Sequence, residues 1–202
     1  MTGRTGSTGA TTEQAASEPP AESWPAGRGV QLTMRRTREQ DRGALRAMVD
    51  GLSRESRYFR FLTGGRVVDE IVDALASPAP GSMALVVVAP DAQGTPAIVA
   101  SAEYVVTGRV AEFAVVVADG WQGQGLGRRL ITKLRDHARA AGLRAMRGDV
   151  LSENRRMLAI LRGLGFSSRR NPEDSFLHEV SMTLREEAGS SQRLPVDWFG
   201  AY

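Results

Sequence analysis

The 202-residue sequence predicts a single mixed α/β domain with a mostly antiparallel central sheet and flanking helices. Residues 82–118 contain three apolar, β-branched runs separated by short turn signals, which is typical of an antiparallel meander. Helical patterns precede this region, and a glycine-rich turn followed by another helical pattern comes directly after it. Hydrophobic residues make up 42% of the chain, which is enough for one core of ordinary size.

The first half of the domain is expected to hold a strand and three helices. The alternating stretch VQLTMRR, residues 30–36, predicts the strand. A helix follows, with Thr37 as its N-cap. Its apolar side chains recur at helical spacing: Ala44, Leu45, Met48, Val49 and Leu52. Two shorter helices are expected over residues 53–62 and 67–77.

The second half is expected to begin with the meander and then to alternate between helices and strands. The expected elements are, in order, strands over 82–89, 96–106 and 109–118, a helix over 126–141, a strand over 143–150, a helix over 153–164 and a strand over 175–184. Gly142 and Gly165 are expected to end the two helices, and Ser152 to cap the second of them.

Both ends of the chain are expected to lie outside the domain. Residues 1–29 are rich in Gly, Ser, Thr, Pro and Ala, and they offer too little apolar surface to offset the entropy lost on ordering. We therefore expect a disordered tail over 1–29, a folded domain over 30–185 and a C-terminal tail over 186–202. The sequence shows no signal-peptide pattern and no run of about 20 apolar residues, which predicts a cytoplasmic protein without membrane contacts.

The amino-acid composition excludes or disfavours several kinds of catalytic and binding site. The chain has no cysteine, which excludes disulfides, thiolate metal sites and a cysteine nucleophile. His137 and His178, the only histidines, lie far apart without carboxylates at ligand spacing, so we expect no metal. The net charge of +3 comes from scattered arginines, with Lys133 as the only lysine, and this pattern favours solvated faces over nucleic-acid binding.

The stretch GWQGQGLGRRL, residues 120–130, predicts an anion site. It lies between a strand and a helix, so the free N–H groups of the first helical turn and the positive end of the helix dipole favour a phosphate. Glycines let the main chain approach the ligand closely, and Arg128 and Arg129 add positive charge.

Other interpretations of this turn differ in strength. A Walker loop requires Lys-Ser/Thr after its last glycine, whereas Arg128 and Arg129 follow Gly127. A dinucleotide fingerprint is disfavoured because the glycines are spaced two and two and a meander precedes them, although Asp149 lies at a suitable distance for a ribose. A turn that only packs a helix against a strand remains open on these grounds.

At these residues the sequence resembles the GNAT acyltransferase superfamily. Gln122-x-x-Gly125-x-Gly127 matches the signature of the family's pyrophosphate turn, AEFAVVVAD precedes it, and ENRRMLAILRGLGF follows with Asn154. The resemblance runs from about residue 30 to 184 and implies the GNAT fold with acetyl-CoA as co-substrate. The implied cofactor residues are Val115, Val117, Gln122, Gly123, Gln124, Gly125, Leu126, Gly127, Arg128 and Asn154. For Asn154, support of its own helix is the equal alternative.

Within the superfamily, the segment before the meander is similar to bacterial protein lysine acetyltransferases. The residues that carry this likeness are Ser53, Glu55, Ser56, Arg57, Tyr58, Arg60 and Phe61. The aromatic side chains of this helix are more often core than acceptor site, yet the helix borders the acceptor cleft in the family. Arg57 or Tyr58 is therefore a candidate for contact with the substrate.

Glu112 is the candidate general base, because acetyl transfer to an amine needs a proton acceptor and this is the only acid in an apolar strand. The resemblance agrees, since AEFA, residues 111–114, matches the family segment that carries the base. A pairing of Glu112 with Arg109 or with an arginine on a neighbouring strand is the alternative, and Glu103 is the rival base.

The resemblance also implies main-chain roles at Val115 and Val117, which would pair with the pantetheine arm, and an oxyanion donor near Val115. Leu161 stands where many members have a tyrosine acid, so the thiolate leaves unassisted or another group protonates it.

We therefore expect an acetyl-CoA-dependent N-acetyltransferase acting on a protein lysine. The alternatives are a small amine as acceptor, or a CoA-sensing protein-interaction module without turnover. The oligomeric state, a dimer included, stays open.

Overall fold

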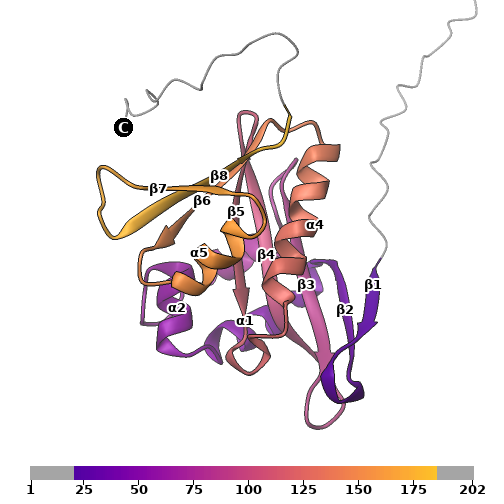
Figure 1. The fold of residues 1–202 in the computed structure, drawn as a ribbon. Coiled ribbons are helices and arrows are strands. Elements are labelled where there is room, and N and C mark those ends of the chain that lie inside the picture. The colour runs from indigo at the N-terminus through magenta and orange to yellow at the C-terminus, as the bar shows by residue number, and fades with distance from the viewer. Residues whose placement is uncertain (1–20, 186–202) are drawn as a thin grey trace, which may run out of the picture.

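The computed structural model describes residues 21–185, which form one mixed sheet flanked by helices (Figure 1). The strand order is β1-β2-β3-β4-β5-β6-β8-β7, and neighbours are antiparallel except for the parallel pair β5 and β6. The strands are β1 (Glu22–Pro25), β2 (Gln31–Arg36), β3 (Met83–Pro90), β4 (Pro96–Thr107), β5 (Val110–Val117), β6 (Ala145–Leu151), β7 (Ser167–Arg170) and β8 (Leu177–Thr183).

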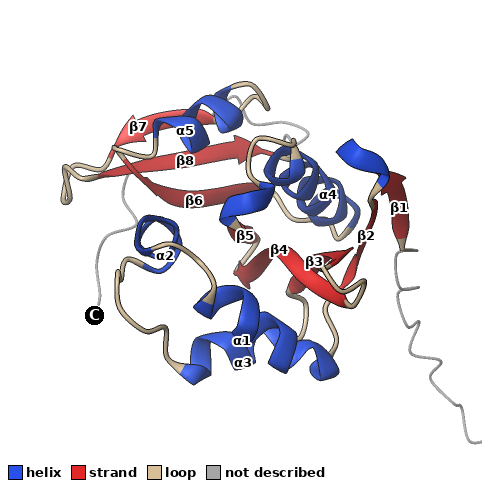
Figure 2. Ribbon diagram, turned by 90° about the horizontal axis from the view of Figure 1, so that it is seen from below, coloured by secondary structure: helices blue, strands red, loops and turns tan. Residues whose placement is uncertain are grey.

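The helices cover both faces of the sheet (Figure 2). They are α1 (Arg42–Asp50), α2 (Arg54–Phe61), α3 (Asp69–Ala76), α4 (Leu126–Ala140) and α5 (Arg155–Arg162), with short 3-10 helices η1 (Gly27–Gly29), η2 (Glu39–Asp41) and η3 (Asp119–Trp121). None of the helices in the described part is long and apolar enough to cross a bilayer.

Two hydrophobic cores lie on the opposite faces. The larger core joins α4 and α5 to the sheet through side chains such as Leu130, Leu134 and Leu161. The smaller core joins α1 and α3 to the other face around Leu45 and Leu75. The predicted meander is confirmed, since β3, β4 and β5 pair in sequence as antiparallel neighbours.

The structure corrects the sequence-based boundaries in four places. The predicted tail over 1–29 contains β1, which pairs with β2 as an edge strand, so the fold begins before residue 30; residues 1–20 and 186–202 lie outside the described part. Thr37 does not cap α1; the N-cap of α1 is Asp41, which forms no side-chain cap hydrogen bond to this helix and instead accepts from the Arg38 N–H at 2.8 Å at the start of η2. Asn154, not Ser152, caps α5. The strand β7 was not predicted from the sequence, and its residues are all exposed.

His137 of α4 joins the helix to two strands of the sheet. Its Nδ1 lies 2.7 Å from the Tyr104 hydroxyl and its Nε2 lies 2.9 Å from Arg36 Nη2. Because a guanidinium only donates, Nε2 accepts and the proton resides on Nδ1 in a neutral ring. Burial lowers the pKa of His137, and the charges of Arg36 and Lys133 lower it further.

We therefore expect the free energy of unfolding to fall as the pH drops from about 7 to about 5. The pKa of His137 is lowered in the folded chain, so the unfolded chain binds the proton first and acid favours unfolding. Thermal unfolding followed by circular dichroism at both pH values measures this slope. The slope should shrink in His137→Gln and persist in the control His178→Gln; equal slopes in wild type and His137→Gln would exclude His137 as its origin.

Candidate active site

The sheet opens where β5 and β6 part. These strands pair over three positions only, the last of which sets Glu112 opposite Arg147. Beyond that position β5 continues on β4, and β6 continues on β8. Among the described strands, none pairs with the β6 side of β5 past Glu112. An extended ligand with amide groups can satisfy these main-chain groups by strand pairing.

The glycine-rich turn follows η3 at the end of β5. Gly123 and Gly125 have φ angles of 83° and 82°, a left-handed conformation that residues with a Cβ rarely adopt. Gly125 is the N-cap of α4, and no side chain caps this end of the helix. The first N–H groups of α4 are thus open to an anion, with the positive end of the helix dipole behind them.

A cleft of about 710 Å³ lies along this turn. Its walls come from the end of β5, η3, the turn, the start of α4, and residues of α2 and α5. Nine of the ten predicted cofactor residues line it: Val115, Val117, Gln122, Gly123, Gly125, Leu126, Gly127, Arg128 and Asn154. Gln124 does not, and its side-chain amide donates to the Gly120 carbonyl at 3.4 Å.

Three arginines, Arg128, Arg155 and Arg156, line the cleft near the turn. Arg156 Nη1 donates to Gln122 Oε1 at 3.3 Å, and a Cβ at Gly123 would lie 3.2 Å from the same guanidinium. Arg128 Nη1 donates to the Gly163 carbonyl at 3.3 Å, just past the end of α5. Guanidinium groups at a helix N-terminus are suited to phosphate groups. Arg155 and Arg156 were not predicted as cofactor residues from the sequence, although they directly follow Asn154, which was.

Asn154 fulfils one of its two predicted roles in the structure. Its Oδ1 accepts a hydrogen bond from the Met157 N–H at 3.1 Å and so caps α5. Asn154 also lines the cleft, so its predicted contact with the cofactor stays a prediction. Ser152 instead donates to the Ser175 carbonyl at 3.4 Å.

Glu112, the predicted base, does not line the cleft but stands at the point where β5 and β6 part. Arg147 Nη2 donates to its Oε1 at 2.5 Å, and the Glu112 side chain is 39% exposed. This contact matches the alternative in which Glu112 pairs with an arginine of a neighbouring strand, and the partner is not Arg109. Because Glu112 also lies at the opening between β5 and β6, its role as general base stays a prediction.

Glu103, the rival base, forms a buried ion pair. Arg60 Nη2 donates to Glu103 Oε1 at 2.5 Å, and both side chains are largely buried. Burial raises the pKa of Glu103, and the adjacent guanidinium partly offsets this effect. Glu103 lies opposite Ala114 in the β4–β5 register and faces a second cavity of about 420 Å³, to which α2 also contributes. Both acids are paired with an arginine, but Glu103 lies at the second cavity and not at the opening between β5 and β6, so Glu103 is the weaker candidate for the base.

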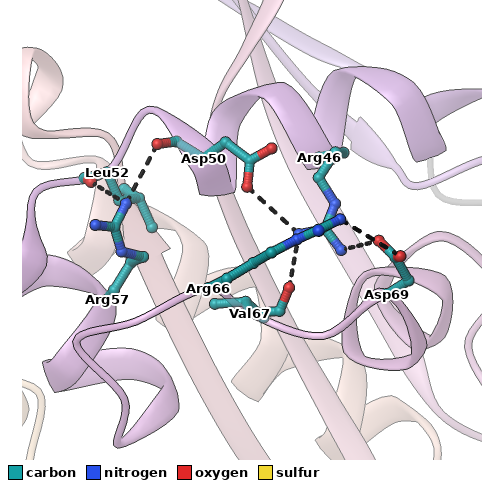
Figure 3. A network of polar contacts seen from close by, with 7 residues as sticks. All are labelled: Arg46, Asp50, Leu52, Arg57, Arg66, Val67 and Asp69. Carbon is teal, nitrogen blue, oxygen red and sulfur yellow. Dashed lines mark hydrogen bonds and ion pairs between the residues drawn. The ribbon is translucent and has the colours of Figure 1, made fainter.

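The helix α2 contacts the cleft through other residues than expected. Ser56, Phe59 and Arg60 line it, whereas the candidates Arg57 and Tyr58 do not. Arg57 turns back to the end of α1 and donates to the carbonyl groups at positions 50 and 52, at 3.2 and 2.7 Å (Figure 3). No residue of α2 is fully buried. The expectation that its aromatic side chains belong to the core holds in part for Phe61, which packs against the smaller core, whereas Tyr58 is exposed and Phe59 lines the cleft.

The network in Figure 3 also fixes the start of α3. Arg46 of α1 donates to the Val67 carbonyl at 2.8 Å and forms ion pairs with Asp50 and Asp69.

Leu161, at the position of the family's tyrosine, is 1% exposed within the larger core and supplies no proton. Within residues 21–185, no group of three or more His, Asp or Glu side chains is placed to hold a metal ion.

Comparison with known proteins identifies relatives of this site. The profile of the Acetyltransferase (GNAT) family matches residues 75–166. Acetyltransferase PA5475 of Pseudomonas aeruginosa is 34% identical over 163 residues, which cover 76% of this chain and 86% of that protein.

Two solved structures share the fold. The GNAT domain of S. lividans PAT superimposes with a TM-score of 0.69 at 20% identity, covering 81% of this chain and 96% of that domain. The acetyltransferase yncA of Salmonella typhimurium, determined with its cofactor acetyl-CoA, gives a TM-score of 0.60 at 21% identity, covering 79% of this chain and 97% of that one.

Proposed function

The chain belongs to the GNAT acetyltransferase family and is an acetyl-CoA-dependent N-acetyltransferase, and on this premise we propose that it acetylates protein lysine side chains with Glu112 as general base. The observation that carries the proposal is the parting of β5 and β6 immediately after Glu112. This opening places a carboxylate beside the β5 edge that leads to the glycine-rich turn.

The main chain and the turn account for binding of the co-substrate. Val115 and Val117 lie on the part of β5 with which no described strand pairs on the β6 side, so this edge can pair with the pantetheine arm, although the Val117 carbonyl already accepts from Gln122. The N–H groups behind Gly125 offer the pyrophosphate an anion site. Arg128, Arg155 and Arg156 add charge for the phosphates. When bound, acetyl-CoA supplies a thioester whose acyl group an amine can attack.

The role assigned to Glu112 is to accept the proton that the amine must lose. The amine nitrogen forms a bond to the acyl carbon, the carbon–sulfur bond breaks, and the proton passes to the carboxylate. A main-chain N–H near Val115 would stabilise the negative charge that develops on the acyl oxygen. The thiolate leaves without help from position 161, where a buried leucine stands.

Local charge supports a cationic acceptor. Asp149 lies opposite Glu179 in the β6–β8 register, two residues after the partner of Glu112. Burial raises the pKa of Asp149 and the charge of Glu179 raises it further, the charge of Arg147 lowers it, and the charge of Glu112 has the smallest effect and raises it. Glu112 is paired with Arg147 and Glu179 with Arg169, so this group of five side chains contains one more acid than base, which would favour the approach of an ammonium group such as that of lysine.

A thiol-release assay with acetyl-CoA tests the acceptor. The panel contains a lysine peptide, the same peptide with arginine in place of lysine, spermine and an aminoglycoside. We expect turnover of the lysine peptide, with kcat/KM at least about tenfold above that of the small amines, a difference of about 1.4 kcal/mol. Turnover of the small amines alone would assign the enzyme to that class, and CoA binding without any thiol release would identify a sensing module.

A further inference from the structure

The helix α2 forms part of the cleft wall but has little packing of its own. It spans eight residues, none of which is fully buried, although Phe61 packs against the smaller core and the Arg60 side chain is largely buried beside Glu103. Helices of this length are not stable alone in water, so contacts outside the helix must hold it in place. Polar links do so in the structure, among them Arg57 to the end of α1, Arg60 to Glu103, and the N-terminal serines to Asp119.

Asp119 holds the N-terminus of α2 with three hydrogen bonds. Its Oδ2 accepts from the Ser53 N–H at 2.8 Å, and its Oδ1 accepts from the hydroxyl groups of Ser53 at 2.8 Å and Ser56 at 2.7 Å. Burial alone would raise the pKa of Asp119, but these hydrogen bonds outweigh it and lower the pKa, so the group is ionised at neutral pH. Asp119 begins η3, the segment between β5 and the glycine-rich turn.

The same hydroxyl of Ser56 also contacts the signature residue of the turn. Gln122 Nε2 donates to Ser56 Oγ at 3.1 Å and to the Val117 carbonyl at 3.1 Å, while Gln122 Oε1 accepts from Arg156 at 3.3 Å. Gln122 thus connects α2, the end of β5 and α5. Its side chain makes these internal contacts directly beside the turn that is suited to phosphate.

We propose that Ser56 and Asp119 are positioning residues that couple occupation of the glycine-rich turn to the order of α2. A ligand that fixes the turn restricts Asp119 and Gln122, and these residues hold the first turn of α2 through Ser56. A short helix without fully buried residues responds strongly to such a restriction, because its local opening free energy is small. The inference rests on the proposed co-substrate site and adds a link from that site to the acceptor-side helix.

Hydrogen–deuterium exchange of residues 54–61, with and without saturating coenzyme A, tests this coupling. In wild type, coenzyme A should slow exchange of α2 by about fivefold or more, the lower end of typical coupling between sites. In Ser56→Ala and Asp119→Asn this ratio should fall towards one. Alanine forms helix more readily than serine, so a loss in Ser56→Ala would not reflect weaker intrinsic helicity.

A matched control separates coupling from a general effect of removing a hydroxyl. Ser168 of β7 contacts His178 Nδ1 at 3.1 Å, and it is not part of the cleft wall. Ser168→Ala should keep the wild-type ratio. Calorimetry with coenzyme A distinguishes two kinds of failure. Absence of binding to wild type would overturn the proposed function, whereas binding with unchanged exchange of α2, or with equal ratios in wild type and Ser56→Ala, would overturn the coupling.

Discussion

Replacing Glu112 with glutamine is expected to lower kcat by about 10²- to 10⁴-fold, the usual contribution of a general base. The amide has nearly the shape of the carboxylate but cannot accept the proton of the amine. Because Glu112 lies outside the lining of the cleft, the Kd of acetyl-CoA should remain close to that of wild type. Steady-state kinetics with the best acceptor and calorimetry with acetyl-CoA measure the two quantities.

Arg147→Gln is the matched control for this substitution. It breaks the same ion pair, 2.5 Å long in the structure, but leaves the carboxylate in place. Exposed pairs contribute only about 0.2–1 kcal/mol to stability, so the fold should tolerate both changes. If Glu112 is the base, kcat should fall far more in Glu112→Gln than in Arg147→Gln. Equal losses of kcat would show that Glu112 only pairs with Arg147. A loss of kcat confined to Glu103→Gln would identify Glu103 of β4 as the base.

Replacing Gly125 with valine is expected to weaken binding of acetyl-CoA by about 10- to 100-fold. A β-branched residue at φ = 82° costs about 1–3 kcal/mol of backbone strain, and relief of that strain would turn the first N–H groups of α4 away from the phosphates. Among residues 21–185, no atom lies within 4 Å of the Cβ that a side chain at Gly125 would add, so the valine would project into the open side of the turn.

Gly94→Val tests whether strain alone explains the effect. Gly94 lies between β3 and β4, has φ = 81°, and likewise has no atom within 4 Å of an added Cβ. Both variants should lose similar amounts of thermal stability, and only Gly125→Val should lose affinity in calorimetry. Retention of wild-type affinity by Gly125→Val would refute the assignment of the turn to the pyrophosphate.

The periodic elements of this fold could be predicted from sequence because their apolar patterns are local. The meander and the long helix α4 are found where the alternation and the helical spacing indicate them. The edge strands β1 and β7 could not be predicted in this way. Each has four residues, and their pairing with β2 and β8 depends on neighbours that the local pattern does not encode.

The same distinction holds for the candidate site. The glycine-rich turn is a local motif, and most residues predicted around it line the cleft. The partner of Glu112 is Arg147, which comes from a strand that becomes its neighbour only in the fold. The contact between Ser56 and Asp119 joins residues 63 positions apart. Arg57 turns to α1, although Ser56 and Phe59 of the same helix line the cleft. Such contacts depend on how the helices pack and are not contained in residue spacing.

The parting of β5 and β6 has a consequence for self-association. An open strand edge at the border of a sheet invites pairing with another chain, which is a common origin of aggregation. Here the open edge lies in the interior of the sheet, between β4 on one side and the diverging β6 on the other. An extended ligand can pair with β5 at this interior position, whereas pairing with a second chain is expected at the two border strands of the described sheet, β1 and β7.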